Sequence, residues 1–260
     1  MTDSNGPVQY AEAMRIDDPT QCQFYHRMDV PGVGEVGGQW DLRKCIRQYL
    51  GDFEFAGKRV LDAGTASGFL TFEMEKLGAE VVSFDMDDGG EWDVVPQKFV
   101  RTNPEAYMKQ VREDHRRLKN AYWFTHQRLA SKAKAYYGDI YDLPNGLGRF
   151  DAAVMGMIIS HLRDPFRAIY KVAQLCDRHL IITNQVYKGK DAVACFAPTT
   201  ENQAERVWWI FTEKCIIQML SVMGFDVVRT VVSKPICLAY GKPSEDRCVA
   251  FVAQRSESRL

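Results

Sequence analysis

The sequence predicts an α/β fold: a doubly wound, mostly parallel sheet of seven strands covered by helices. Short apolar runs alternate along the chain with longer helical patterns, which is the arrangement of strand–helix–strand units. The runs are rich in Val, Leu and Ile almost throughout, as expected for strands buried on both faces. Because 260 residues accommodate one large domain, we expect a single domain over residues 1–260.

Each expected strand is a short apolar run followed by a turn or a helical pattern. Parallel strands are predicted over residues 58–63, 80–84, 135–138, 150–155 and 179–183. A closing antiparallel pair is predicted over residues 225–232 and 248–253. Helices are predicted over residues 69–77, 165–176 and about 205–223. The last helix ends before Gly224, a residue type that commonly terminates helices.

Two segments exceed a minimal α/β unit. Residues 1–57 form an N-terminal helical arm, in which an amphipathic helix is predicted over residues 40–49. Residues 89–135 form a helical, cap-like insertion between the second and third strands, where a crossover needs only about a dozen residues. The segment 102–105 (TNPE) combines a polar cap, a first-turn Pro and a Glu three residues after the Thr. A long helix is therefore predicted from there towards Ala133, with a break near Asn120.

The overall charge is almost balanced, with 33 Lys and Arg against 34 Asp and Glu. This balance argues against a protein that coats a polyanion. The insertion departs from it, because residues 89–135 hold ten Lys and Arg against five Asp and Glu, a local charge of +5. A solvated helix face explains such a run most simply, and binding of RNA or of an anionic substrate is the alternative.

The seven cysteines are scattered and form no Cys-x-x-Cys pair. This pattern predicts reduced thiols in a cytoplasmic protein, and it predicts no metal site. The first residues lack the basic-then-apolar layout of a signal peptide. No apolar run approaches the ~20 residues of a membrane span, so we expect no membrane association.

The most informative segment is residues 60–70 (VLDAGTASGFL), where a strand runs through a turn of small residues into a helix. Small residues such as Gly64, Ala66 and Gly68 let a ligand approach the backbone, and the helix start offers free N–H groups. The next strand ends at Asp85, whose carboxylate is placed to accept both hydroxyls of a ribose. This Rossmann-like arrangement predicts a nucleoside-type cofactor at the carboxyl ends of the strands.

The cofactor is not expected to be a dinucleotide. A dinucleotide fingerprint needs its third glycine where this chain has Phe69, which disfavours a nicotinamide-dependent oxidoreductase. The loop is instead spaced as Gly-x-Gly-x-Gly with Ala66 at the middle glycine. Asp62, two residues before the loop, suits a cationic ligand, and the alternative is that it partners the start of the following helix.

At these residues the sequence resembles the class I S-adenosylmethionine-dependent methyltransferases. The segments 138–144 (GDIYDLP), 150–156 (FDAAVMG) and 161–165 (HLRDP) look like the branch that contains tRNA wobble-uridine (5-oxyacetic acid) methyltransferases, and the resemblance covers about residues 38–185. It implies that Asp139 faces the adenine amino group and that Ile140 packs on the ring. The residue before the histidine, a tyrosine in the tRNA enzyme, is Ser160 here, so ordinary S-adenosylmethionine is expected. The cofactor-binding residues expected are Trp40, Asp62, Gly64, Ala66, Gly68, Asp85, Met86, Asp139, Ile140 and Gly156.

The catalytic candidate is His161, which follows the fourth strand at the expected crevice. Its ordinary pKa suits a general base, and the alternative is that it only pins the turn through a backbone hydrogen bond. Aromatic side chains are dense in the segments expected to roof the site, and a closed aromatic pocket would position the acceptor and exclude water. The substrate-binding residues expected are Tyr25, His26, Trp123, Arg128, Tyr187, Trp208 and Trp209.

The expected function is methyl transfer from S-adenosylmethionine to a small organic acceptor, anionic or aromatic, with secondary metabolism as one setting. The sequence leaves open whether the acceptor atom is O, N or C, and whether the chain forms a homo-oligomer. Two alternatives stay open as well: RNA modification that uses the basic insertion, and a non-catalytic subunit that binds the cofactor.

Overall fold

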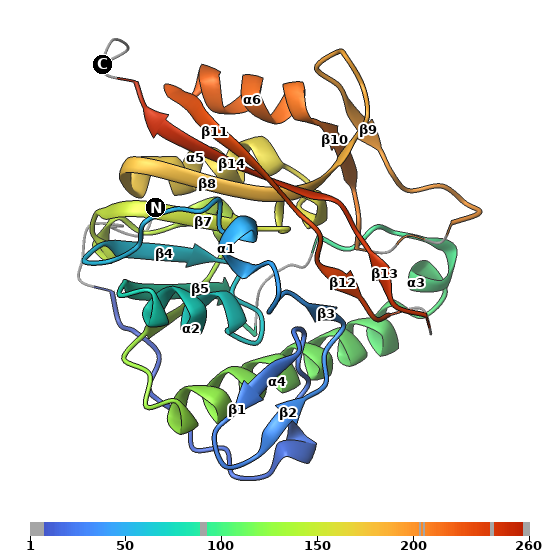
Figure 1. Ribbon diagram of the computed structural model, residues 1–260. Coiled ribbons are helices and arrows are strands. Elements are labelled where there is room, and N and C mark those ends of the chain that lie inside the picture. The colour runs from blue at the N-terminus through green and yellow to red at the C-terminus, as the bar shows by residue number, and fades with distance from the viewer. Residues whose placement is uncertain (1–7, 89–92, 203, 205, 240–241, 257–260) are drawn as a thin grey trace.

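A mostly parallel sheet runs through the centre of the computed structural model, which describes residues 8–88, 93–202, 204, 206–239 and 242–256 (Figure 1). Its seven main strands lie in the order β11-β14-β8-β7-β4-β5-β6, and β14 is antiparallel to both of its neighbours. The predicted seven-stranded sheet and its antiparallel pair are confirmed. The strand bounds are, in that order, Phe225–Ser233, Cys248–Arg255, Cys176–Tyr187, Phe150–Gly156, Arg59–Ala63, Glu80–Met86 and Lys134–Gly138.

Two short strands extend this sheet, and the second of them lies where a helix was predicted. β10 (Trp209–Thr212) lies parallel to the end of β8, and β9 (Ala194–Phe196) pairs with β10. The prediction of a helix from residue 205 is therefore wrong, and α6 spans Glu213–Val222. The run WWIFT is aromatic and β-branched, so it suits a strand, and the Thr212 hydroxyl caps α6 by accepting the Cys215 N–H.

The sheet has a separate hydrophobic core on each face, since neighbouring strand residues point to opposite sides. Leu61 and Met155 belong to the core covered by α5 (Pro165–Leu175) and α6. Val60 and Val154 belong to the core covered by α1 (Ile46–Tyr49), α2 (Phe69–Lys76) and the N-terminal arm. Three short 3-10 helices, η2 (Ile140–Asp142), η3 (Asn145–Leu147) and η4 (Ile159–His161), lie in the loops after β6 and β7.

The described part of the N-terminal arm consists mostly of loops with short strands and two single helical turns, so the expectation of a helical arm is wrong. After the 3-10 helix η1 (Pro19–Gln21), β1 (Met28–Val30) and β2 (Gly34–Val36) form an antiparallel hairpin. The predicted helix over 40–49 divides into β3 (Trp40–Asp41) and the single turn α1. β3 pairs with β12 (Ile236–Cys237), which pairs with β13 (Ser244–Glu245). This long-range pairing overrides the local helical pattern.

The insertion lies between β5 and β6, as predicted, and consists of α3 (Lys98–Thr102) and the long helix α4 (Pro104–Arg128). The cap of α4 is Asn103, whose side chain accepts the Ala106 N–H at 3.2 Å. α4 continues unbroken past Asn120, whose side-chain amide donates to the Gln21 carbonyl of the arm. The expected break is therefore wrong. No helix among the described residues is both long and apolar enough to cross a membrane.

Within the arm, the backbone at Gly38 lies too close to the backbone of residues 26 and 27 for a side chain at Gly38. A Cβ on this residue would lie 2.2 Å from the carbonyl carbon of His26 and 2.5 Å from the Arg27 nitrogen. We expect Gly38→Ala to lower the free energy of unfolding by about 1–3 kcal/mol, since overpacking forces the backbone apart. Chemical denaturation measures the effect, and limited proteolysis should show a more exposed arm. Gly37→Ala is the control, because its Cβ would meet nothing within 4 Å. Equal stability of the two variants would contradict this contact.

Candidate active site

The candidate site lies at the carboxyl ends of β4 and β7, where neighbouring strands connect in opposite directions. Residues 64–68 form the loop after β4, and three of them have left-handed backbone: Gly64 at φ +90°, Ala66 at +50° and Gly68 at +88°. A Cβ on Gly64 would lie 2.5 Å from the Ile158 side chain, and one on Gly68 would lie 2.6 Å from Phe72. Both glycines are therefore required by conformation and by space.

Asp85 closes the other side of this loop from the end of β5. Its Oδ2 accepts the Ala66 N–H at 2.6 Å, and its Oδ1 accepts the Met86 N–H at 2.8 Å. The loop is held to the same strand by two further bonds, from the N–H groups of Gly64 and Thr65 to the Phe84 carbonyl. The structure thus brings Gly64, Ala66, Gly68, Asp85 and Met86 together, as the sequence predicted.

Asp62 is fully buried and faces the start of α2. Its Oδ2 accepts the hydroxyl of Thr71 at 2.6 Å, and that hydroxyl also contacts the hydroxyls of Thr65 and Ser83. Burial raises the pKa of Asp62 to about 6, against the lowering effect of its hydroxyl partners. This placement matches the alternative role as a partner of the helix start.

A small cavity beside the loop joins four of the predicted residues. Its lining includes Tyr25, His26, Trp40 and Gly156, together with Leu42, Tyr49, Met157 and Pro235. Its volume of about 20 Å³ holds about one water molecule. Met157 is held at φ +59°, an unusual conformation that concentrates at functional sites. The sequence did not predict Tyr49 or Met157 in this lining. The positive φ of Met157 marks that residue, but it is visible only in the structure.

The arm lies directly on the loop at Tyr25 and His26. The Tyr25 N–H donates to the Ser67 hydroxyl at 3.1 Å, and the His26 ring lies 5.4 Å from the Phe69 ring. His26 is 7 % exposed, and its Nδ1 has no hydrogen-bond partner within the described part of the chain. Burial lowers the pKa of His26 to about 3, so the ring is neutral at pH 7.

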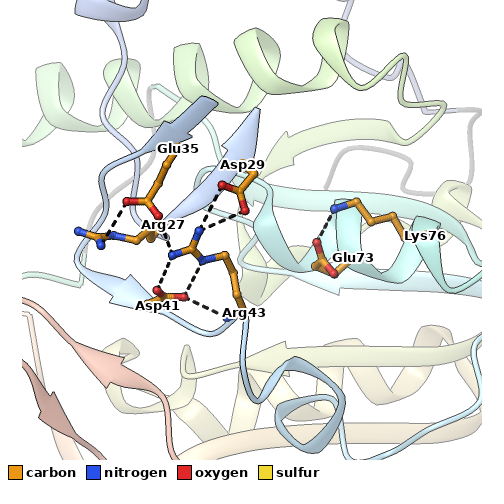
Figure 2. Close-up of polar contacts among 7 residues, drawn as sticks. All are labelled: Arg27, Asp29, Glu35, Asp41, Arg43, Glu73 and Lys76. Atoms are coloured by element: carbon orange, nitrogen blue, oxygen red, sulfur yellow. Dashed lines mark hydrogen bonds and ion pairs between the residues drawn. The ribbon is translucent and has the colours of Figure 1, made fainter. Parts of the chain in front are cut away.

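An arginine cluster joins the short strands of the arm to one another, as Figure 2 shows. Arg43 pairs with Asp29 of β1, Glu35 of β2 and Asp41 of β3 at 3.1, 2.9 and 2.8 Å. Arg27 pairs with Glu35 as well. The cluster borders a second cavity of about 230 Å³, whose lining residues are Met28, Asp29, Arg43, Phe69, Phe72, Glu73, Lys76 and Leu129. Phe69 therefore separates this cavity from the ring of His26.

Asp139 and Ile140 follow β6 at the same edge of the sheet as Asp85. The pairing of Met86 with Gly138 places Asp139 one residue beyond the level of Met86. Asp139 is exposed and accepts the Tyr141 N–H at 2.8 Å, while Ile140 is 8 % exposed and packs in the core. Both lie where the resemblance implies an adenine site.

His161 ends η4, in the loop after β7. Its Nδ1 lies 2.6 Å from the Arg206 carbonyl, which can only accept, so Nδ1 carries the proton. Nε2 is then the basic nitrogen. Burial lowers the pKa of His161 below 6.5, against the opposing effect of the Arg206 carbonyl, so the ring is neutral at pH 7. The bond pins the loop, as one of the two alternatives expects, and the role of His161 as a general base stays a prediction.

The remaining predicted substrate residues lie outside the small cavity. Trp123 is 3 % exposed and packs against Tyr122 and His126, because it points inward from α4. Arg128 lies on the Phe124 ring at 3.5 Å and donates to the Ile16 and Asp17 carbonyls. These two placements contradict the expected substrate contacts and assign both side chains to packing and anchoring.

The other aromatic candidates lie along β8 and β10. Tyr187 is 59 % exposed near the end of β8. The indole N–H groups of Trp208 and Trp209 donate to the carbonyls of Asp93 and Arg163. The Trp208 N–H donates to the Ser160 carbonyl, which places this residue beside His161.

Several basic side chains of the insertion bind partners within the chain. Arg117 donates to the Thr20 and Cys22 carbonyls of the arm, and Arg116 pairs with Glu113. Lys119 pairs with Asp88 at 2.6 Å. Arg117 therefore holds the arm, and Lys119 holds the segment that follows β5.

The buried neutral His26 makes the arm sensitive to acid. The unfolded chain takes up this proton near the ordinary pKa of 6.5, whereas the folded chain takes it up only near 3. The stabilisation is complete above pH 6.5 and is lost as the pH falls towards 3, by up to about 1.4 kcal/mol per pH unit. We expect urea denaturation to show a steeper loss between pH 6.5 and 4 for the wild type than for His26→Phe. Parallel pH profiles would contradict a buried neutral ring.

Comparisons with known proteins identify a family and a fold for this chain. A family model described as "Methyltransferase domain" matches residues 41–230. Among solved structures, the 1,6-didemethyltoxoflavin-N1-methyltransferase of Burkholderia thailandensis is 16% identical, with a TM-score of 0.54 over 83% of this chain and 78% of that one. The magnesium protoporphyrin IX methyltransferase of Synechocystis PCC 6803 is 18% identical, with a TM-score of 0.51 over 83% and 82%.

A methyltransferase of Methanosarcina mazei, described as SAM-dependent, is 19% identical, with a TM-score of 0.51 over 83% of this chain and 99% of that one. No curated protein matches this chain. The likeness to the tRNA wobble-uridine branch stays a prediction. The family model covers most of the chain, including the loop, Asp85 and His161. The chain therefore belongs to the methyltransferase domain family.

Proposed function

We propose that the chain is an S-adenosylmethionine-dependent methyltransferase that acts on a small organic molecule. The observation that carries the proposal is the junction of the left-handed loop with Asp85, where Ala66 and the carboxylate lie 2.6 Å apart at the ends of two parallel strands. Family membership supports the reaction type. The solved neighbours are named for small acceptors, 1,6-didemethyltoxoflavin and magnesium protoporphyrin IX.

The residues at this junction fit the cofactor. Gly64 and Gly68 carry the left-handed backbone that shapes the loop, and Ile158 and Phe72 fill the space that a Cβ on either residue would take. Asp85 would accept the ribose hydroxyls, Asp139 and Ile140 would border the adenine, and Trp40 and Gly156 would border the remainder. When bound, the cofactor supplies a methyl group on a positively charged sulfur. The enclosed cavity of about 20 Å³ would border only the part of the cofactor near Trp40 and Gly156.

The chain itself would orient the acceptor and remove its proton. Nε2 of His161 is basic and neutral at pH 7, and it lies in the loop after β7, one of the two strands that border the crevice. Tyr25, His26 and Trp40 would close over the reacting groups and exclude water. Exclusion of water favours a reaction in which the charge on sulfur disappears.

RNA modification is the weaker alternative because Arg117, Lys119 and Arg128 hold parts of the same chain. A small acceptor needs no such basic surface. The acceptor atom, whether O, N or C, is open to experiment.

Cofactor binding can be measured by isothermal titration with S-adenosylhomocysteine. We expect Asp85→Asn to weaken binding about 10- to 100-fold, the range for hydrogen bonds to a charged group. Asp87→Asn is the matched control, since Asp87 is an exposed neighbour on the same segment. Unchanged affinity in Asp85→Asn would remove its ribose role, and binding of NAD without binding of S-adenosylhomocysteine would overturn the proposed function.

The role of His161 can be tested with methyl-labelled S-adenosylmethionine and a panel of small acceptors. We expect His161→Gln to lower turnover about 100-fold, a typical contribution of general base catalysis, with no change in cofactor affinity. If the residue only pins the loop, the variant should lose stability while it keeps its turnover. That outcome would exclude His161 as the base.

A further inference from the structure

The insertion helix α4 contributes a buried histidine to the end of β5. His115 is 4 % exposed, and its Nε2 lies 3.4 Å from Oδ1 of Asp85. Its Nδ1 lies 3.8 Å from Oδ1 of Asp88, three residues further along the chain. The imidazole therefore sits between two carboxylates, one of which belongs to the candidate cofactor site.

A buried lysine one turn later on α4 completes this contact. Lys119 is 7 % exposed, and its Nζ pairs with Asp88 at 2.6 Å and lies 4.1 Å from the centre of the Tyr137 ring. Residues four apart on a helix share one face, so His115 and Lys119 both contact the acids at the end of β5, Asp85 and Asp88. Two buried basic side chains on one segment are uncommon on a helix whose only role is to cover a sheet.

We propose that His115 is a positioning residue that holds the Asp85 carboxylate for the ribose of the cofactor. This inference rests on the proposed function. Three donors then restrain the same group: the Ala66 N–H from the loop, the Met86 N–H from β5 and His115 from the insertion. The insertion is thereby part of cofactor recognition as well as a cover for the sheet.

The geometry suggests how strongly His115 acts. At 3.4 Å its bond to Asp85 is long, so it restrains the carboxylate less tightly than the two backbone donors at 2.6 and 2.8 Å. A net hydrogen-bond contribution of about 1 kcal/mol corresponds to about a fivefold change in affinity. The effect should appear in cofactor binding and should require the Asp85 carboxylate.

The test compares two polar variants by isothermal titration with S-adenosylhomocysteine. The side-chain amide of Gln can place an N–H near the position of Nε2, whereas the shorter Asn cannot. We expect His115→Asn to weaken binding about fivefold and His115→Gln to retain it. Arg112→Asn is the control, since it removes a basic side chain from an exposed position on the same helix. Thermal denaturation shows whether each variant is folded.

A double-mutant cycle with Asp85→Asn separates the possible outcomes. If His115 acts through Asp85, His115→Asn should weaken binding no further once Asp85 is changed. Independent, multiplied losses would overturn the positioning role, as would wild-type affinity in His115→Asn. Unchanged affinity in Asp85→Asn would instead contradict the proposed cofactor site.

A measurement on the wild type covers the case in which His115→Asn does not fold. The ring resonances of His115 should shift when S-adenosylhomocysteine is added, while those of His126, further along the same helix, should not. A His115 signal that ignores the ligand would overturn the proposal.

Discussion

The hydrogen bond from the Ala66 N–H to the Asp85 carboxylate is the contact on which the site depends. Ala66 adopts a left-handed backbone in this loop, and its N–H points to the carboxylate at the end of the neighbouring strand. The parallel register of β4 and β5 brings the ends of both strands to the same level. The loop, Asp85 and the start of α2 thus meet at one junction. The arm contacts this junction through Tyr25, and the insertion contacts it through His115.

Helix α4 links the peripheral segments to that junction. Three of its side chains bind main-chain carbonyls of the arm: those of Arg117, Asn120 and Arg128. Two others contact acids at the end of β5: His115 lies near Asp85, and Lys119 pairs with Asp88. Three of the ten Lys and Arg in residues 89–135, namely Arg117, Lys119 and Arg128, thus have structural roles within the chain. The same helix thus contacts the arm on one side and Asp85 on the other.

The sheet and the loop could be predicted from sequence because their signals are local: apolar runs for strands, small residues for the turn and an acid at the next strand end. The segments at 40–49 and 205–212 could not, since Trp40 pairs with Cys237 and Phe211 with Val186, far away in the chain. Trp123 and Arg128 were misplaced for a related reason. Their spacing does not show which side of α4 faces the sheet and which faces the arm.

Phe69 occupies the position where a dinucleotide fingerprint requires glycine, and its ring supports His26 on one side and borders a cavity on the other. A loop that fits a dinucleotide would thus need changes in the arm as well as a glycine at residue 69. Replacing the ring with glycine would leave the arm without its support, and the arm would have to be rebuilt at the same time. A glycine at residue 69 would therefore alter the packing of the arm as well as the cofactor fingerprint of the loop.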